Sequence, residues 1–471
     1  MRVLRTLAAF SLLGRFAGGE NCGEEGEDWC ALENAQETVA AARQPQTGRR
    51  IAPTHTPLPL IEAALKNTHH DPEELSILQK KSKKEWQVLH LERFEGREVA
   101  AETCELQKSK CKLRSLESTT LIQPGGKTTC MHPQEGAYEF VVRKGDPEKL
   151  VFFLQGGGAC WDPISYERRV CTMDISYSKK VSGLLHNRGI FNSDDSQNPF
   201  RTWTMVEVLY CSGDLHVGDV VGAVPQRGYQ NTQAALDWVA SNVGSLHSLL
   251  IMGSSAGALG AQFWSQRILE ALPHHHAMVL ADSYAGYFPE KTEGPILQGW
   301  QSCTVPVFTP KIQDACVLGS ITVPMVVTST MAANTKVIYG QIESKEDKEQ
   351  RKFFDLVAIT FQKAIPPLDG DTFYAATNLI FEEYNKYPNY ISFLVDGEHH
   401  TFGSSWSTAG TNGPREGSPE GVPSLQEWVT EPWTKSKKKK DDCVSSQCKG
   451  TEVDLVTLAT QCGEKLLKEI C

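Results

Sequence analysis

The residues Gly253-Ser254-Ser255-Ala256-Gly257 form a GxSxG pentapeptide, a pattern typical of a nucleophilic serine. An apolar stretch that predicts a strand precedes it, and a stretch with one apolar helical face follows it. A tight turn between strand and helix makes the central side chain project, and flanking glycines let the neighbouring backbone approach closely. The alternative is a glycine-rich turn with an inert serine. We expect Ser255, rather than Ser254, to be the nucleophile of an acyl-transfer reaction.

A second glycine-rich run, Gln155-Gly156-Gly157-Gly158-Ala159, follows the strand-like sequence LVFFL. Consecutive glycines let backbone N–H groups converge without interference from Cβ atoms, which an oxyanion hole requires. Lipase-type enzymes carry an HGGG-like stretch at the same point of the chain. The run lacks the Lys and Ser/Thr that complete a phosphate-binding P-loop. We therefore expect the N–H groups of Gly157 and Ala256 to form an oxyanion hole.

The general base is expected after the last strand, because the triad of such enzymes follows the chain order Ser, Asp or Glu, His. The segment Asp396-Gly397-Glu398-His399-His400-Thr401 supplies two histidines at this point. The cluster His274–His276 precedes a strand-like run and His216 lies in a turn-like segment, so neither fits this order. We expect His400 to be the base.

These residues are carried by alternating strand-like and helical stretches. The strand-like runs are AYEFVVRKG, KLVFFLQGGG, WTMVEVLYCSG, HSLLIMGSSAG, HHAMVLADSYAG, ITVPMVVTST and YISFLVDGEHHTF, and the helical ones include TQAALDWVASNV and ALGAQFWSQRILEAL. Apolar strands that alternate with helices predict a mostly parallel sheet covered on both faces. We therefore expect an α/β fold, a three-layer α/β-hydrolase-like architecture with a mostly parallel central sheet.

The 471 residues are expected to divide into four parts. Residues 1–19 combine a basic start, an apolar middle and small residues, the pattern of a signal peptide. Residues 20–115 alternate polar runs with short apolar patches, and we expect a partly ordered N-terminal extension or a pro-segment. Residues 116–430 form the predicted esterase domain. Residues 431–471 are expected to be a Lys-rich linker and a cysteine-containing tail.

The chain contains 14 cysteines, and several stand in short-range pairs: Cys104/Cys111, Cys160/Cys171, Cys303/Cys316 and Cys443/Cys448. No tight CxxC cluster with accompanying His indicates zinc, so we expect disulfides and no metal, and the pairing stays open. With the signal peptide, this predicts a protein secreted to the extracellular space or to an endomembrane lumen.

Charge and hydropathy argue against nucleic-acid binding and against a membrane-spanning segment. The formal net charge of −10 argues against nucleic acid, whose binding depends on a basic surface. The apolar stretch at the start is shorter than the roughly 20 residues that a membrane span requires. We expect no membrane span in the mature chain.

The motifs together resemble the pectin acetylesterase/Notum family of carboxylesterases, and the matching pieces span about residues 118–405. They are LVFFLQGGGACWD, WTMVEVLYCSGDLHVGD, the GSSAG pentapeptide, ADSYAGYF and GEHHTF. The YCSGDxHxG run is the most specific and resembles the microbial branch. The resemblance implies an α/β-hydrolase-like fold and hydrolysis of an O-acyl ester, with Ser255 as nucleophile and His400 as base. Members act on acetylated pectic polysaccharide or, in the animal branch, on a fatty-acylated serine of a signalling protein.

One position departs from the pattern of that family. The family's acid is an Asp in a D-x-x-Q-type motif after the strand that here reads VPMVVTST. That position is Ala333, followed by Asn334, with Lys336 in place of the Gln. Three explanations stay open: Asn334 orients the histidine as a neutral acceptor, Asp369 or Asp371 substitutes from another loop, or the enzyme is weak or inactive. Loss of such a carboxylate costs about 10⁴ in kcat.

The sequence therefore predicts a secreted carboxylesterase that hydrolyses O-acyl, and specifically O-acetyl, esters on a polysaccharide. The expected partner is an acylated polysaccharide or another O-acyl ester. No cofactor is expected, because a triad and an oxyanion hole suffice for acyl transfer. Two other functions stay open: a protein O-deacylase of the same fold, and a catalytically silent carbohydrate- or protein-binding module. The depth of the acyl pocket distinguishes a protein O-deacylase from the predicted enzyme. An ester-hydrolysis assay distinguishes a silent binding module from both.

Overall fold

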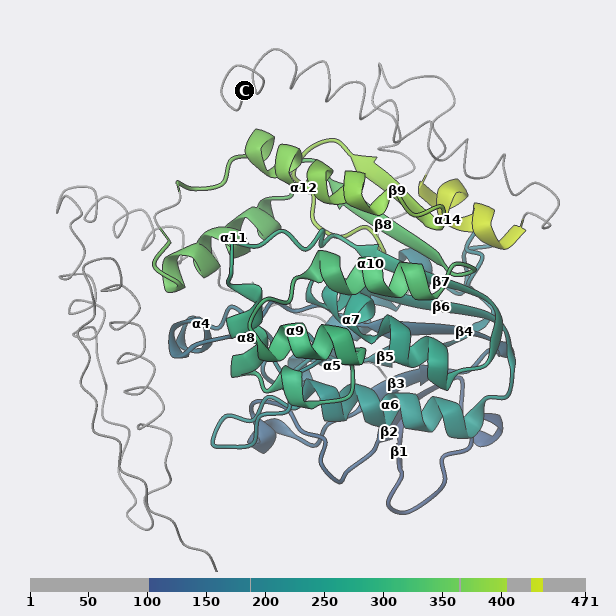
Figure 1. Ribbon diagram of the computed structural model, residues 1–471. Coiled ribbons are helices and arrows are strands. Elements are labelled where there is room, and N and C mark those ends of the chain that lie inside the picture. Colours follow the sequence, from purple (N-terminus) through teal and green to yellow (C-terminus); the bar gives the residue numbers. More distant parts are fainter. Residues whose placement is uncertain (1–100, 187, 364–365, 405–424, 435–471) are drawn as a thin grey trace, which may run out of the picture. The chain divides into compact units, whose positions relative to one another are not determined.

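The computed structural model describes residues 101–186, 188–363, 366–404 and 425–434 (Figure 1). The predicted signal peptide, most of the predicted extension and most of the predicted tail lie outside these residues. Within the described ranges, no helix combines the length and the apolar composition needed to cross a membrane.

The described residues form one nine-stranded sheet with the strand order β1-β2-β3-β5-β4-β6-β7-β8-β9. The strands are β1 (Glu102–Glu105), β2 (Thr119–Gln123), β3 (Phe140–Arg143), β4 (Asp146–Leu154), β5 (Trp203–Val208), β6 (Leu246–Ser254), β7 (His274–Asp282), β8 (Ile338–Ser344) and β9 (Tyr390–Val395). Strand β3 is antiparallel to both of its neighbours, and the other pairs are parallel. The predicted mostly parallel sheet is confirmed.

Helices connect the strands. They are α4 (Pro163–Glu167), α5 (Ile175–Leu185), α6 (Gly228–Asn242), α7 (Ala256–Ala271), α8 (Glu293–Gly299), α9 (Pro310–Val317), α10 (Val323–Ala333), α11 (Lys348–Thr360), α12 (Gly370–Tyr384) and α14 (Leu425–Thr434). Four 3₁₀ turns of the described chain are η1 (Leu113–Ser115), η2 (Pro133–Glu135), η3 (Gly189–Phe191) and η4 (Ser302–Thr304).

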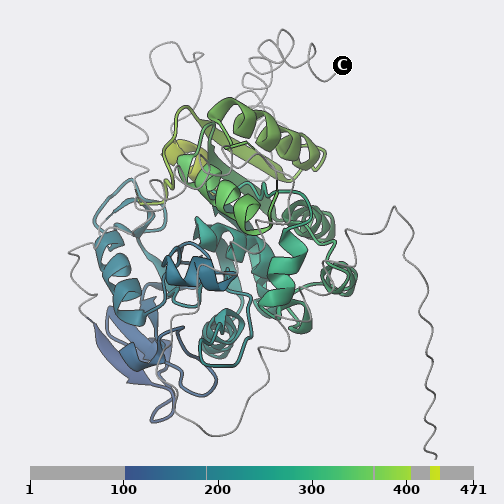
Figure 2. The ribbon, with the colours of Figure 1, turned by 90° about the vertical axis from the view of Figure 1, so that its left-hand side faces the viewer.

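The side chains of β4 show that both faces of the sheet are packed against other elements. Its residues alternate between two buried clusters, because successive side chains of a strand point to opposite faces. Phe152 packs in a cluster that includes residues of α6, α7 and α10. Val151 and Phe153 pack in a second cluster with η3 and α14. Figures 1 and 2 show helices on either side of the sheet. The expected three-layer α/β-hydrolase fold is confirmed.

The structure differs from the prediction at the run VPMVVTST, which is helix α10 and not a strand. The side chain of Thr322 accepts a hydrogen bond from the Met325 N–H, and Pro324 lies in the first turn. Both features start a helix. The strand of this region is β8, whose sequence IYGQIES was not predicted as one because Gln341 and Glu343 interrupt its apolar pattern.

Residues 102–105, which lie within the predicted N-terminal extension, form β1 and pair with β2. Three of the short-range cysteine pairs form disulfides: Cys104–Cys111, Cys160–Cys171 and Cys303–Cys316. A fourth disulfide, Cys130–Cys211, joins residues 81 positions apart. The pair Cys443/Cys448 lies outside the described residues.

Candidate active site

Ser255 stands in a sharp turn between β6 and α7, at the carboxyl end of a central strand. Its backbone φ is 56° and ψ is −126°, a conformation that a residue with a Cβ rarely adopts. The flanking glycines permit it: a Cβ on Gly253 would lie 1.9 Å from the carbonyl oxygen of Gly257. A Cβ on Gly257 would lie 2.0 Å from the carbonyl oxygen of Leu154. The turn therefore requires glycine at both positions.

The two serines of the turn have different surroundings. The hydroxyl of Ser254 donates a hydrogen bond of 2.7 Å to the Asp282 carboxylate. The side chain of Ser255 lines a pocket that His400 also lines. Of the two serines, Ser255 shares the pocket with His400, whereas the Ser254 hydroxyl is bonded to Asp282.

His400 lies in the loop after β9, the last strand in the described chain. Its Nδ1 is 2.8 Å from Oδ2 of Asp347, so Nδ1–H donates to the carboxylate and Nε2 is left for the pocket. His399 is exposed, and its ring lies against Phe402. The second histidine of the pair, rather than the first, therefore joins the pocket.

The acid that contacts His400 is Asp347, which the sequence prediction missed. Asp347 is fully buried and caps the N-terminus of α11, where its Oδ1 accepts the N–H groups of Glu349 and Gln350. Its Oδ2 accepts His400 and the side-chain amide of Gln350, at 3.0 Å. The sequence Asp347-Lys348-Glu349-Gln350 is the D-x-x-Q pattern that was expected after a strand, and it follows β8.

The prediction that Asn334 orients the histidine is wrong. Asn334 is the C-terminal capping residue of α10. Its side-chain amide donates to the Thr330 carbonyl, at 2.9 Å, and to the side-chain oxygen of Gln266. The alternative acids Asp369 and Asp371 are exposed at the start of α12, where Asp369 caps the helix by accepting the Thr372 N–H.

The ionisation of His400 depends on its neighbours. Burial by itself lowers the pKa of His400, but the charge of Asp347 and its hydrogen bond act the other way and raise the pKa above its ordinary value. Next to Asp347, burial raises the pKa of Glu343 well above the ordinary range, and the Asp347 charge adds to this. The Gln350 amide donates to both carboxyl groups. Gln350 therefore bridges the two carboxyl groups behind the imidazole.

A second buried carboxylate, Asp282, fixes the loop that carries the histidine. Besides Ser254, it accepts the N–H groups of Phe402, at 2.8 Å, and Gly403, at 2.7 Å. The Thr401 N–H donates to the Ser283 hydroxyl, at 2.8 Å. Asp282 therefore joins the serine turn to the histidine loop.

The glycine run after β4 lies against the serine turn. A Cβ on Gly156 would lie 2.4 Å from the carbonyl oxygen of Ser254 and 3.0 Å from Cβ of Ser255. Gly158 and Ala256 line the pocket, whereas Gly157 is not among its lining residues. Ala256 begins α7, so its N–H has no partner carbonyl within the helix. Gly156 thus lies against Ser255, and Gly158 and Ala256 share its pocket.

The pocket beside Ser255 is small and mostly apolar. It encloses about 30 Å³, room for about two water molecules. Its walls are Gly158, Ala159, Trp161, Leu215, Ala256, Leu259, Tyr284, Phe288, Ile296, Trp300, Glu349, Gln350, Phe353 and Val357, with Ser255 and His400. Among the described residues, no group of three or more His, Cys, Asp or Glu side chains is placed to hold a metal ion.

Comparisons with known proteins agree with the motifs. Residues 110–342 match the model of the pectinacetylesterase family. Pectin acetylesterase 11 of Arabidopsis thaliana is 29% identical over 187 residues, which are 37% of this chain and 47% of the relative. Pectin acetylesterase 7 of the same organism is 30% identical over 187 residues with the same coverage. The chain spans about half the length of these curated relatives.

Among solved structures, two crystal forms of the Wnt deacylase Notum from Drosophila are similar to this chain. Each has a TM-score of 0.45, with 16% and 15% sequence identity. The similarity covers 61% and 62% of this chain and 88% of each Notum chain. The resemblance of the sequence motifs to the pectin acetylesterase/Notum family is confirmed by the match of residues 110–342 to the pectinacetylesterase model.

Proposed function

We propose that this protein is a serine carboxylesterase in which Ser255 is the nucleophile, His400 the general base and Asp347 the acid of the triad. The observation that carries the proposal is the shared pocket of Ser255 and His400, together with the hydrogen bond from His400 to buried Asp347. Nucleophile, base and a group that orients the base are the three parts of a triad.

Acylation follows from these positions. The Ser255 hydroxyl attacks the ester carbonyl while Nε2 of His400 removes its proton, and Asp347 stabilises the imidazolium that forms. His400 then returns the proton to the departing alcohol, and the acyl group stays on Ser255. Water, activated by His400 in the same way, releases the acid and restores the serine.

The tetrahedral intermediate of each step carries an oxyanion. We assign its stabilisation to backbone N–H groups of Gly157, Gly158 and Ala256. Donors that are fixed before the reaction stabilise this charge without reorganising, and removal of one such donor costs about 10²–10³ in kcat. Gly157 and Ala256 follow from the sequence, and Gly158 is added because it lines the pocket.

The substrate we propose is an O-acetyl ester of a polysaccharide. A pocket of about 30 Å³ supports an acetyl group and opposes a long fatty chain, which disfavours the protein O-deacylase of the same fold. Relatives named as pectin acetylesterases support a polysaccharide as the alcohol part of the ester. Four disulfides within the described part of the chain support secretion to an oxidising compartment. The silent binding module is disfavoured because the acid is present as Asp347.

The proposal is tested with a fluorophosphonate probe and with p-nitrophenyl esters of increasing chain length. We expect the probe to label Ser255, Ser255→Ala to abolish both labelling and hydrolysis, and acetate to be hydrolysed faster than octanoate. Ser254→Ala should keep the labelling and lose only stability, by about 1 kcal/mol for its hydrogen bond to Asp282. Labelling that persists in Ser255→Ala contradicts the assigned nucleophile, and faster hydrolysis of octanoate contradicts the assigned acyl group.

A further inference from the structure

The segment Tyr210–His216, which reads YCSGDLH, is the most specific motif of the sequence and has no role in the chemistry described above. It is buried and lies against the glycine run that follows β4. Two of its side chains donate to carbonyl groups of that run: Nε2 of His216 to Gln155, at 2.8 Å, and the hydroxyl of Tyr210 to Gly158, at 2.9 Å. The N–H of Thr172 donates to the carbonyl between them, that of Gly157, at 2.7 Å.

These three hydrogen bonds fix the peptide planes of the glycine run. In a trans peptide the N–H points away from the preceding carbonyl. The Gly157 carbonyl points toward Thr172, so the Gly158 N–H, which belongs to the same peptide plane, points away from Thr172. The peptide that carries the Gly157 N–H lies between two planes that His216 and Thr172 hold. Without such partners, glycines would be the residues most able to rotate.

The Tyr210 hydroxyl has two partners, which fix its direction. It accepts the Leu215 N–H, at 2.9 Å, and donates to the Gly158 carbonyl. Gly158 has a φ of 70° and packs so closely on the chain that a Cβ would lie 2.0 Å from the Val170 carbonyl oxygen. No larger residue fits at Gly158, and the hydroxyl of Tyr210 is the side-chain donor that holds its carbonyl.

His216 is neutral, with its proton on Nε2. The Gln155 carbonyl can only accept, so Nε2 carries the hydrogen, and Nδ1 accepts from the Thr232 hydroxyl at 3.4 Å. Burial lowers the pKa of His216 to about 4, which keeps the ring neutral. Gly260 of α7 leaves room for the ring, since a Cβ there would lie 2.8 Å from it. His216 thus lies between the glycine run and the helix of the nucleophile.

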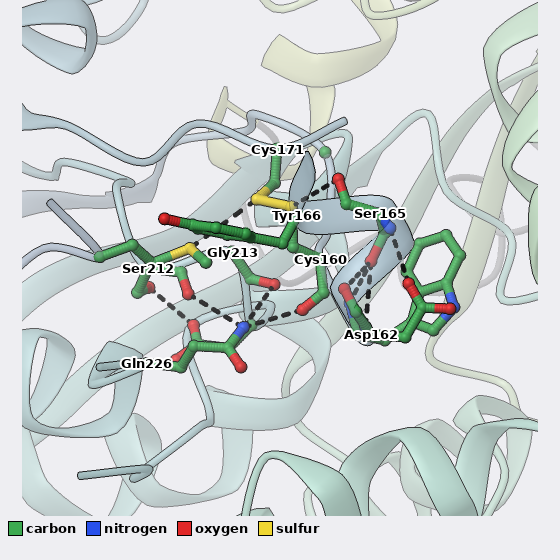
Figure 3. The surroundings of a disulfide bond; sticks show 12 residues. Cys160, Asp162, Ser165, Tyr166, Cys171, Ser212, Gly213 and Gln226 are labelled. Carbon is green, nitrogen blue, oxygen red and sulfur yellow. Dashed lines mark hydrogen bonds between the residues drawn. A yellow bond between two sulfur atoms is a disulfide. The ribbon is translucent and has the colours of Figure 1, made fainter. Parts of the chain in front are cut away.

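The downstream end of the glycine run is tied to the same segment (Figure 3). The Cys160 N–H donates to the Gly213 carbonyl, at 2.8 Å, and the side-chain amide of Gln226 donates to the Cys160 carbonyl, also at 2.8 Å. The same amide reaches the carbonyls of Ser212 and Gly213, at 3.4 and 3.3 Å. The Cys160–Cys171 disulfide links this end of the glycine run to the segment that carries Thr172.

We propose that Tyr210 and His216 are positioning residues, which hold the two peptide planes on either side of those that carry the Gly157 and Gly158 N–H groups, so that these two amides keep their direction toward the oxyanion. This rests on the esterase function proposed above. The role concerns the transition state, because the oxyanion exists only there.

Tyr210→Phe tests the proposal, and Tyr138→Phe is its matched control. Tyr138 is equally buried, and its hydroxyl donates to the Leu209 carbonyl, at 3.2 Å, outside the glycine run. We expect Tyr210→Phe to lower kcat for p-nitrophenyl acetate at least tenfold with KM changed less than about twofold. Release of the Gly158 carbonyl lets the adjoining plane with the Gly158 N–H turn, and complete loss of such a donor costs about 10²–10³. Affinity for a boronic acid, which forms a tetrahedral adduct with the serine, should fall by the same factor. Tyr138→Phe should leave both values within twofold.

Equal kcat in the two variants overturns the proposal. If Tyr210→Phe does not fold, His216→Gln and His216→Leu answer the same question, because the Gln amide can donate to the Gln155 carbonyl and Leu cannot. We expect Gln to retain at least tenfold more of kcat than Leu, and equal loss in the two overturns the proposal. A wild-type protein that neither hydrolyses acetate esters nor reacts with the probe contradicts the esterase function itself. An active wild type with unchanged variants contradicts only the positioning role.

Discussion

At the scale of single residues, Asp347 uses its two oxygens for different purposes. Oδ1 caps α11 and Oδ2 holds the imidazole of His400. An Asn at this position keeps an oxygen for the cap, because Asn and Asp are equally good at helix N-termini. Its amide group, however, faces the Nδ1–H of the histidine and cannot accept from it. The cap and the orientation of the base can therefore be separated by one substitution.

We expect Asp347→Asn to lower kcat by about 10⁴, as in other triads that lose the carboxylate. The helix cap is kept, and the melting temperature should fall only by the loss of the two hydrogen bonds that Oδ2 accepts from His400 and Gln350. Asn334→Ala is the control, since its side chain contacts Gln266 and Thr330 rather than the histidine. Ala333→Asp places a carboxylate at an exposed position and should also leave kcat unchanged. Steady-state kinetics on an acetate ester measures all three. A rise in kcat for Ala333→Asp, or a loss for Asn334→Ala, would argue for an acid at α10.

The raised pKa of His400 sets the acid side of the pH profile. The base must be neutral to accept the serine proton, so kcat/KM rises as the pH passes upward through the pKa of His400. We expect this rise above about pH 6.5, the ordinary value for imidazole, since Asp347 raises the pKa. In Asp347→Asn the residual activity should rise at a lower pH than in the wild type. A profile that does not move between the two proteins would contradict the coupling of these residues.

The placement of Ser255 and His400 in one pocket could be predicted from the sequence because their motifs are local. Asp347 could not, since its position depends on which segment forms the strand before it. The apolar run of α10 has the composition of a buried strand, whereas the strand before the acid is the polar β8, so the sequence pattern places the acid at Ala333 instead of Asp347. In the pairing with β7 and β9, Gln341 and Glu343 of β8 are buried and hydrogen-bonded, partly to Gln350. Partners that are distant in the sequence stabilise such a polar strand, and the alternation of apolar and polar residues along the strand does not reveal them.

At the scale of elements, the connection from β6 to α7 depends on close backbone contact. We expect Gly257→Ala to destabilise the fold by about 1–3 kcal/mol or more, because its Cβ would overlap the Leu154 carbonyl at the end of β4. Reaction of Ser255 with the fluorophosphonate probe should fall as well. Gly244→Ala is the matched control: this exposed glycine follows α6, and a Cβ there meets no atom within 4 Å. Its stability should stay within about 0.5 kcal/mol of the wild type. Urea unfolding of the two variants makes the comparison, and equal stabilities would contradict the packing described for β4 and α7.

At the scale of the whole molecule, the disulfides differ in the length of chain that they close. Cys130–Cys211 joins residues 81 positions apart, and Cys104–Cys111 joins residues 7 apart. From chain entropy, removing the first is expected to cost about 4.5 kcal/mol and removing the second about 2.4 kcal/mol. Replacing each pair by alanines and measuring thermal unfolding tests this order. A larger loss for the Cys104/Cys111 variant would show that native contacts, rather than the unfolded chain, dominate the effect.

The order of the site residues along the chain has a consequence for synthesis on the ribosome. The nucleophile turn emerges first, the acid later, and the histidine loop only after β9. Asp282 lacks the N–H donors of Phe402 and Gly403 until that loop has emerged. A nascent chain that ends before the loop therefore carries Ser255 without its base. With the proposed triad, we expect a serine that reacts with esters only once all nine described strands have been translated, and an incomplete chain that esters do not acylate in the cell that makes it.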